Sequence, residues 1–361
     1  MLDQAQSVRT GEELDASRLR PYLTDQLNEN GELEIQQFPG GFSNLTYLIR
    51  FGGQEYVLRR PPLGANVKSG HDMEREFRVL SALVKAFPKA PRPVAYCGNA
   101  SVLGAPFYLM ERVRGVILRP EDVRHPAGHP AGHNPALTPG VMRRLSEKLI
   151  DSLAEIHAVD LEATGLNAMG KPVGYAQRQV EGWTKRYRAA QTDDIAAMDT
   201  IADWLCTHLP PERYVSFLHN DFKYDNVVLN PDLTEITAIL DWELSTVGDP
   251  LMDLGTCLSY WVEATDPEPM RLFGLTALPG NFTRGQVAEY YAARSGREIK
   301  DLLFYYAYGL FKTAVIIQQI YARYRKGLTQ DARFAPLIHL LRAFAATAEK
   351  ALEKGRIDRL G

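Results

Sequence analysis

The residues best suited to chemistry lie in one segment, SFLHNDFKYDNVVLNPDLTEITAILDWELSTVGDPLMDLG, which starts at Ser216. Two apolar runs within it, separated by a polar turn, predict a β-hairpin. Asp221 precedes the first run, Asn226 begins it, and Asp241 ends the second. Because a hairpin brings these ends together, we expect the two carboxylates and the amide oxygen to converge. Such oxygen ligands suit Mg²⁺ and leave room for phosphate, while Asp221 could accept the proton of an attacking hydroxyl.

The spacing of these residues resembles the catalytic loop of kinases. His219-x-Asp221-x-x-x-x-Asn226 matches the pattern H-x-D-x-x-x-x-N, and Asp241 stands where those enzymes carry Asp-Phe-Gly. The element GDPLMDL that follows makes the segment most similar to the aminoglycoside phosphotransferase and choline kinase family. A lone catalytic-loop match is a weak signal, but the three elements in this order are specific. The resemblance implies that Asp221 is the catalytic base, that Asn226 and Asp241 bind the metal, and that Lys223 contacts the transferred phosphate.

The segment departs from the kinase pattern at two places. Asn220 stands where Arg or Gly is commoner, and Trp242-Glu243 replaces Phe-Gly. The missing glycine suggests that this loop does not flip between two positions. The alternative interpretation, in which these acids only form turns or cap helices, fits Asp249 and Asp225 but not the whole trio.

A nucleotide-binding half should precede such a catalytic half. The stretch PGGFSNLTYLIR contains a glycine turn, at which Gly41, Ser43 and Asn44 could cradle phosphate oxygens. It lacks the G-x-G-x-x-G pattern, so an ordinary hairpin is the alternative. The strand that follows ends in Arg59, which replaces the phosphate-binding lysine of kinases in this resemblance. Glu76, on the next predicted helix, is its expected ion-pair partner.

Neighbouring residues of the same types receive different interpretations. Strand alternation sends Arg60 to the face opposite Arg59, and Glu74 is expected at the surface. The run FYLMERV, which ends at Val113, resembles the hinge of kinases. The resemblance implies that the Glu111 carbonyl and the Val113 amide bind adenine, and hence that ATP is the co-substrate.

The pattern of elements predicts an α+β, protein-kinase-like fold with two lobes. A small β-rich N-lobe over 1–112 would bind nucleotide, and a larger helical C-lobe over 113–361 would carry the catalytic loop, the metal site and the acceptor pocket. Periodicity and turn signals predict strands at 33–38, 45–51, 55–59, 93–97, 106–113, 226–229 and 236–240, and helices at 15–29, 71–87, 139–159, 174–190, 195–208, 251–262, 284–295, 299–324 and 333–354. Asp15 is the expected N-cap of the first helix, and Gly52-Gly53 predicts a hairpin turn.

Composition limits the class of protein without naming a reaction. The chain has 361 residues, 45% apolar and 24% charged, and a net charge of −3, so no global basic field points to nucleic acid or to an anionic membrane. The N-terminus lacks an apolar leader, and the three cysteines are scattered, so we expect a cytoplasmic protein. The longest apolar stretch, 302–321, is interrupted by polar residues and predicts a buried helix.

Two observations concern the acceptor. The forms GGFSNLTY, YVLRRPP, HNDFKYDN, DWELSTVGDPLMDL and IYARYRKGLT resemble the kinase domain found fused to acyl-CoA dehydrogenases, which implies a hydroxylated acyl-CoA or a related alcohol. Residues 261–361 contain 15 Lys and Arg against 10 Asp and Glu, which favours an anionic acceptor over a polycationic aminoglycoside. Arg323, Arg325 and Lys326 form the densest basic cluster. A solvated helix end is the alternative interpretation of that cluster.

Other functions stay open at this point. An aminoglycoside, choline-like or sugar kinase would keep the chemistry and change the acceptor, and a pseudokinase would bind nucleotide without turnover. His125, His129 and His133 recur every four residues, but the intervening Pro and Gly favour an exposed loop over a helical metal site. The oligomeric state is not indicated.

Overall fold

The computed structural model describes residues 4–38, 44–62, 71–119, 136–272, 274–329 and 332–360. The chain forms two compact units. The first comprises Met1–Ile117, Glu162–Leu166 and Asn226–Ser245, and the second comprises Leu118–Leu161, Asn167–Asp225 and Thr246–Gly361. A small sheet and a larger helical part confirm the α+β class. The functional lobe boundary after residue 112 stays a prediction.

The first unit is built on a five-stranded antiparallel sheet with the strand order β1-β2-β3-β5-β4. Its strands are β1 (Glu34–Gln37), β2 (Leu45–Phe51), β3 (Gln54–Arg60), β4 (Pro93–Cys97) and β5 (Phe107–Glu111). Each lies within one residue of its predicted bounds at the N-terminal end. Gly52 and Gly53 both adopt positive φ and join β2 to β3, because this tight turn needs a left-handed backbone.

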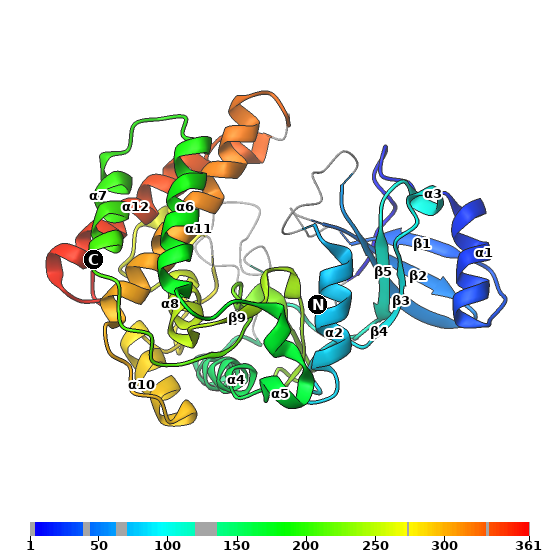
Figure 1. Ribbon diagram of the computed structural model, residues 1–361, viewed down its shortest axis with the longest axis horizontal. Helices are drawn as coiled ribbons and strands as arrows, with labels where there is room; N and C mark the ends of the chain where they lie inside the picture. The colour runs from blue at the N-terminus through cyan, green and yellow to red at the C-terminus, as the bar shows by residue number, and fades with distance from the viewer. Residues whose placement is uncertain are drawn as a thin grey trace. The chain divides into compact units, whose positions relative to one another are not determined.

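Helices cover the two faces of this sheet, as Figure 1 shows. On one face, α1 (Ala16–Leu27) packs Leu19 and Leu23 against Tyr47 and Leu58, and the short α3 (Ala100–Leu103) lies nearby. On the other face lies α2 (Met73–Leu83). Asp15 caps α1 as predicted, and Asp72 caps α2. Since Arg59 alternates with Leu58 along β3, its side chain points to the α2 face.

The predicted hairpin forms from β7 (Val227–Leu229) and β8 (Ile236–Ile239). It belongs to the first unit because Val116 and Leu229 exchange two backbone hydrogen bonds of 2.8 Å. The 3₁₀ turn η4 (Trp242–Leu244) follows. Trp242 is buried, donates its indole N–H to the Ile239 carbonyl at 2.8 Å, and meets the Phe87 ring edge-on. This anchor fixes the segment that carries Asp241.

The second unit is mainly helical. Its longer helices are α4 (Pro139–His157), α6 (Tyr175–Ala190), α7 (Ala196–Thr207), α8 (Pro250–Tyr260), α10 (Arg284–Ser295), α11 (Leu302–Arg325) and α12 (Leu337–Lys354). Its shorter helical pieces are α9 (Glu268–Arg271) and η5 (Ala332–Phe334). The pieces α5 (Leu161–Thr164), η2 (Leu166–Met169) and η3 (Tyr224–Asn226) each include residues of both units, α5 mostly of the first. The two-stranded pair of β6 (Ser216–Leu218) and β9 (Thr246–Gly248) was not predicted. Among the described helices, none is long and apolar enough to cross a membrane.

Two glycines let α8 and α11 approach closely. A Cβ added to Gly255 would lie 2.1 Å from the Tyr305 carbonyl oxygen, and one added to Gly309 would lie 2.0 Å from the Gly255 carbonyl oxygen. Both contacts are with backbone, which cannot move aside as a flexible side chain can. The packing of α8, which holds the catalytic loop described below, therefore depends on the absence of side chains at these positions.

Gly309→Ala is expected to lower the free energy of unfolding by about 1–3 kcal/mol, because the new methyl group forces the two helices apart. Gly182→Ala is the matched control, since a Cβ at this position in α6 would meet only the Arg186 guanidinium at 3.6 Å. Its higher helix propensity should raise stability by about 0.5–1 kcal/mol. Urea denaturation measures both, and equal stabilities of the two variants would contradict the close-approach argument.

Candidate functional site

The catalytic loop is held by a buried carboxylate of α8. Asp253 is fully buried and accepts hydrogen bonds from the backbone amides of His219 at 2.7 Å and Asn220 at 2.8 Å. His157 donates to the same carboxylate at 3.1 Å, and the Tyr291 hydroxyl lies 2.7 Å from its other ring nitrogen. Burial lowers the pKa of His157, and although Asp253 opposes this shift, the net change is downward. His157 is therefore a neutral core residue that donates through Nε2.

Asp221 lies next in the chain, and its carboxylate has two close partners. The Tyr260 hydroxyl donates to Oδ1 at 2.7 Å, and Lys223 Nζ lies 3.2 Å from Oδ2. Burial raises the pKa of Asp221, but Lys223 and Tyr260 outweigh it, so the net shift is downward. Burial would lower the pKa of Lys223, yet Asp221 raises it above its usual value. The two residues thus form an ionised pair, and Asp221 carries the charge that a proton acceptor needs.

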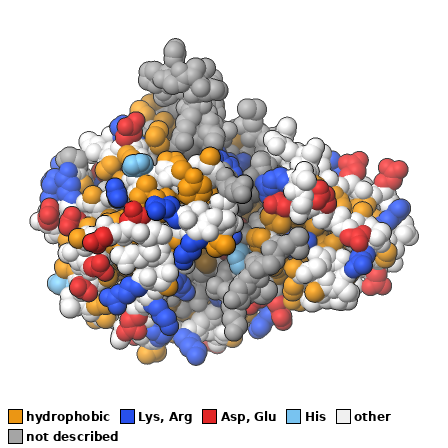
Figure 2. All heavy atoms as spheres, turned by 90° about the horizontal axis from the view of Figure 1, so that it is seen from above, with side chains coloured by type: hydrophobic (Ala, Val, Ile, Leu, Met, Phe, Trp, Pro, Cys, Tyr) orange, Lys and Arg blue, Asp and Glu red, His pale blue; other side chains and the backbone are white. Residues whose placement is uncertain are grey.

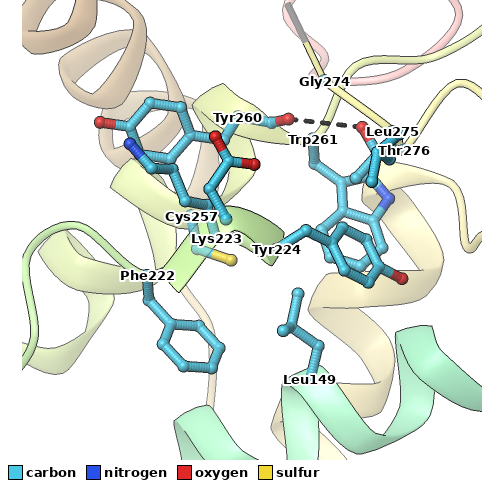
Figure 3. Close-up of a pocket in the computed structure, with 11 residues that line it drawn as sticks. Leu149, Phe222, Lys223, Tyr224, Cys257, Tyr260, Trp261, Gly274, Leu275 and Thr276 are labelled. Atoms are coloured by element: carbon cyan, nitrogen blue, oxygen red, sulfur yellow. Dashed lines mark hydrogen bonds between the residues drawn. The ribbon is translucent and has the colours of Figure 1, made fainter. Parts of the chain in front are cut away.

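A small cavity lies beside this pair, and Figure 3 shows its lining. Lys223 and Tyr224 border it from the catalytic loop, and Cys257, Tyr260 and Trp261 border it from α8 and its end. Its volume is about 20 Å³, which is room for one water molecule. The dashed line in Figure 3 is the hydrogen bond from Thr276 to the Tyr260 carbonyl, which ties the far wall to α8. A water molecule in this cavity could hydrogen-bond to the catalytic loop, but the cavity is too small for a substrate.

In the first unit, Arg59 binds three carboxylates. Its Nη1 lies 2.6 Å from Glu76, and its Nη2 lies 2.7 Å from Asp241 and 3.2 Å from Glu243. Burial would lower the pKa of Arg59, but Glu76 and Asp241 raise it further, so the guanidinium stays charged. Its Nε is buried without a hydrogen-bond partner in the described parts of the chain. The predicted pairing with Glu76 is confirmed, and Glu74 is exposed as expected.

Arg60 behaves differently from Arg59, as strand alternation predicts. It is also buried, but its guanidinium Nε donates to the Pro61 carbonyl at 3.2 Å, and burial lowers its pKa. The two adjacent arginines therefore occupy opposite faces of the sheet. Only the one on the α2 face reaches the carboxylates that could take part in phosphate or metal binding.

The hairpin brings Asn226 and Asp241 together at one end. The Leu240 amide donates to the Asn226 carbonyl at 2.8 Å, and Asp241 follows with a left-handed φ of 62°. The Asp241 side chain is 41% exposed, so its carboxylate is accessible despite the Arg59 contact. Within the described residues, no group of three or more His, Cys, Asp or Glu is placed to hold a metal ion. A site with one carboxylate and one amide fits Mg²⁺, which takes its remaining ligands from water and phosphate.

Asn44 contacts the carboxylate cluster around Arg59 through Glu243. Its Nδ2 donates to Glu243 at 2.6 Å, and its Oδ1 lies 2.8 Å from His71 Nδ1. The predicted phosphate-binding residues Gly41 and Ser43 lie outside the described residues, as do His125, His129 and His133. Asp221 belongs to the second unit and Asp241 to the first, and the convergence of their carboxylates stays a prediction.

The predicted hinge is the end of β5 and the segment after it. The Glu111 amide donates to the Arg92 carbonyl at 2.8 Å, which pairs the strand with the approach to β4. The Val113 amide makes no hydrogen bond with any residue in the described ranges. Arg112 contacts Glu55 at 2.8 Å and fixes the chain between these two positions.

Three residues at these sites were missed by the sequence reasoning. The sequence predicts no functional role for Glu243, Tyr260 or Lys312, although Glu243 departs from the kinase glycine and Lys312 is one of the polar residues that interrupt the apolar stretch 302–321. Lys312 donates to the Asn220 carbonyl at 2.6 Å. A polar residue inside an apolar helical run was the available signal for Lys312, since buried charges seldom occur without a role.

The chain matches known proteins over most of its length. A family model described as the phosphotransferase enzyme family matches residues 34–290. Acyl-CoA dehydrogenase family member 10 of Mus musculus is 36% identical over 331 residues, which are 90% of this chain and 30% of that protein. Acyl-CoA dehydrogenase family member 11 of Gallus gallus is 34% identical over 361 residues, 96% of this chain and 44% of that protein. The chain thus spans less than half the length of these curated relatives.

Solved structures agree with this assignment. A Ralstonia eutropha protein assigned as an aminoglycoside phosphotransferase is 32% identical, with a TM-score of 0.78 over 95% of this chain and 99% of that one. Choline kinase from Cryptosporidium parvum shares the fold, with a TM-score of 0.63 at 12% identity over 94% of this chain and 97% of that one. Together with the family match, these similarities show that the chain belongs to the phosphotransferase enzyme family and is a small-molecule kinase with the protein-kinase-like fold.

Proposed function

We propose that the chain transfers the γ-phosphate of ATP to a hydroxyl group of a small anionic acceptor. Asp221 is the catalytic base in this proposal, and Asn226 and Asp241 are the protein ligands of Mg²⁺. The observation that carries the proposal is the ionised Asp221, held by Lys223 and Tyr260 at the end of a tightly bonded loop. A carboxylate with a lowered pKa, fixed in direction, can accept a proton without first losing one.

In the proposed reaction the acceptor oxygen bonds to the γ-phosphorus as the bond to the bridging oxygen of ADP breaks. The acceptor proton passes to a carboxylate oxygen of Asp221. Lys223 neutralises that carboxylate before transfer and can contact the phosphoryl oxygens as charge shifts onto them. When bound, Mg²⁺ would neutralise phosphate charge and align the transferring group.

Nucleotide binding is assigned to the first unit. Arg59 is held by Glu76 and contacts the proposed metal ligand Asp241, and it would contact the α and β phosphates. Gly41, Ser43 and Asn44 are proposed to face the phosphates from the glycine turn. The Val113 amide and the Glu111 carbonyl are proposed to bind the adenine edge.

For the acceptor, we propose a hydroxylated acyl-CoA. The relatives at 34–36% identity bear acyl-CoA dehydrogenase names, and this chain aligns with a part of each of them. Arg323, Arg325 and Lys326 are exposed at the end of α11, where they could meet the phosphates of CoA. On the face in Figure 2, Lys and Arg are intermixed with Asp and Glu.

Asp221→Asn is expected to lower kcat by roughly 10²–10⁴-fold and to leave ATP binding nearly unchanged, because the base acts on the acceptor hydroxyl. Asp241→Asn should instead weaken binding of Mg-ATP, which calorimetry with and without Mg²⁺ measures. Asp232→Asn, on the exposed turn of the hairpin, is the matched control and should behave as the unmodified chain. Full turnover by both Asp221→Asn and Asp241→Asn would show that these roles are misassigned, and binding of ATP without turnover in the unmodified chain would indicate a pseudokinase.

Arg59→Met should lower the free energy of unfolding by about 3–5 kcal/mol, because it leaves the buried Glu76 carboxylate without its cation. It should also raise the KM for ATP. Arg60→Met is the control, since Arg60 is equally buried but its recorded partner is a backbone carbonyl. Urea denaturation and initial rates measure the two effects, and equal losses in the two variants would argue against a specific role for Arg59.

Screening the purified chain with Mg-ATP against hydroxyacyl-CoAs, the free hydroxy acids, choline and kanamycin tests the acceptor class. The CoA ester should have the lower KM, and added salt should narrow its advantage over the free acid. Replacing both Arg323 and Arg325 with Ala should raise the KM for the CoA ester roughly tenfold and leave that for ATP unchanged.

Arg271→Ala, an exposed arginine on α9, is the control for that double variant. Equal KM values for the ester and the free acid would exclude a CoA anchor. Efficient phosphorylation of kanamycin or choline would assign the acceptor to the antibiotic or amino-alcohol class instead.

A further inference from the structure

Lys312 lies in the middle of α11 and is 2% exposed. Its Nζ donates to the Asn220 carbonyl at 2.6 Å and lies 3.5 Å from the Thr256 hydroxyl. The Trp183 ring is 5.8 Å away. No carboxylate among the described residues forms an ion pair with it. A buried ammonium without a paired carboxylate is costly, so its presence calls for a compensating role.

The hydrogen bond from Lys312 is accepted by the peptide group between Asn220 and Asp221. That group has the Asn220 carbonyl on one side, held by Lys312, and the Asp221 amide on the other, which donates to His219 Nδ1 at 3.2 Å. Asn220 itself adopts a left-handed φ of 65°, which is unfavourable for a residue with a side chain. Holding both sides of this peptide fixes the backbone from which the Asp221 side chain extends.

Two other hydrogen bonds hold Asn220 through its amide and through its side chain. The Asn220 amide donates to Asp253, and the Tyr175 hydroxyl donates to the Asn220 side-chain oxygen at 3.3 Å. Neither contact sets the direction of the Asn220–Asp221 peptide plane. Lys312 does so from a helix far away in sequence, and its charge makes the bond stronger than one to a neutral donor.

The electrostatic surroundings of Lys312 are mixed. Burial lowers its pKa to about 8. Asp221 and Asp253 oppose that shift, whereas Lys223 and Arg186 add to it. The ammonium form therefore prevails at neutral pH and is lost as the pH rises above about 8.

We propose that Lys312 is a positioning residue for phosphoryl transfer. Its ammonium group donates a hydrogen bond to the Asn220 carbonyl and thereby orients the Asp221 carboxylate. The inference rests on the proposed role of Asp221 as the base, and it goes beyond that role by naming what orients it. A residue kept at a cost in stability is a common mark of a functional site. The charge of Lys312 also helps to keep Asp221 ionised.

Lys312→Met tests the proposal in the full chain. Turnover is measured as ADP release from Mg-ATP with water as the acceptor, so that the result does not depend on the acyl-CoA hypothesis. We expect kcat to fall roughly 10–100-fold, because a small misplacement of a catalytic group has effects of this size. The KM for ATP should stay within about twofold, and the Tm should be unchanged or higher, since a buried charge is removed. Lys300→Met, at an exposed lysine, is the control.

Stability and activity should respond to pH in opposite directions. The pKa of Lys312 is about 8 in the folded chain and 10.5 ordinarily, so the unfolded chain binds more protons between these values. The contribution of Lys312 to stability therefore rises as the pH increases from 8 to 10.5. Turnover should fall over the same pH range, because the hydrogen bond from the charged Lys312 ammonium to the Asn220 carbonyl is lost. Lys312→Arg, which stays charged, should lack this alkaline fall, a test that holds even where Lys312→Met folds poorly.

A double variant separates the two proposals. If Lys312 acts through Asp221, then Lys312→Met combined with Asp221→Asn should be no slower than Asp221→Asn alone. Independent, multiplying losses would overturn the positioning role, as would a Lys312→Met variant with a lower Tm and unchanged kcat. An active Asp221→Asn variant would instead refute the proposed base, whatever Lys312→Met does.

Discussion

The buried carboxylate of Asp253 is the constraint on which the catalytic loop depends. Burial raises its pKa, but His157 and the loop amides outweigh that effect, so the carboxylate stays ionised inside the second unit. The amides of His219 and Asn220 stabilise its charge as long as they point at it, and His157 adds to this effect. The packing of α8 and the conformation of the catalytic loop therefore depend on each other. The same helix ends at Tyr260, which holds Asp221 from the other side.

Local sequence rules predicted the elements whose determinants are local. Asp15 as a cap and the Gly52-Gly53 turn require only the residue types within a few positions. Strand alternation separated Arg59 from Arg60, and helix periodicity separated Glu76 from Glu74. These rules place a side chain on a face of an element, and where α2 covers that face of the sheet, this is enough to predict the partner of Arg59.

Contacts between distant segments could not be predicted in this way. Tyr260 meets Asp221 across 39 positions, Lys312 meets Asn220 across 92, and Asn44 meets Glu243 across 199. None of these pairs follows from periodicity or from a short motif, because each depends on how whole helices and loops pack. The pair β6 and β9 was missed for the same reason, since each strand has three residues and no alternating pattern of its own.

The two units differ in charge balance in a way that bears on the proposed metal. Around the catalytic loop, Asp221 and Asp253 have Lys223 and Lys312 nearby, so the buried charges compensate. Around Arg59, one guanidinium faces three carboxylates within 3.2 Å, and the negative charge is in excess. The only one of the three that is substantially exposed is Asp241. A divalent cation at Asp241 would remove that excess and draw the carboxylate away from Arg59. Arg59 Nη2 would then keep Glu243 as its remaining carboxylate, and its less neutralised charge would attract phosphate more strongly, so metal and nucleotide binding would reinforce each other.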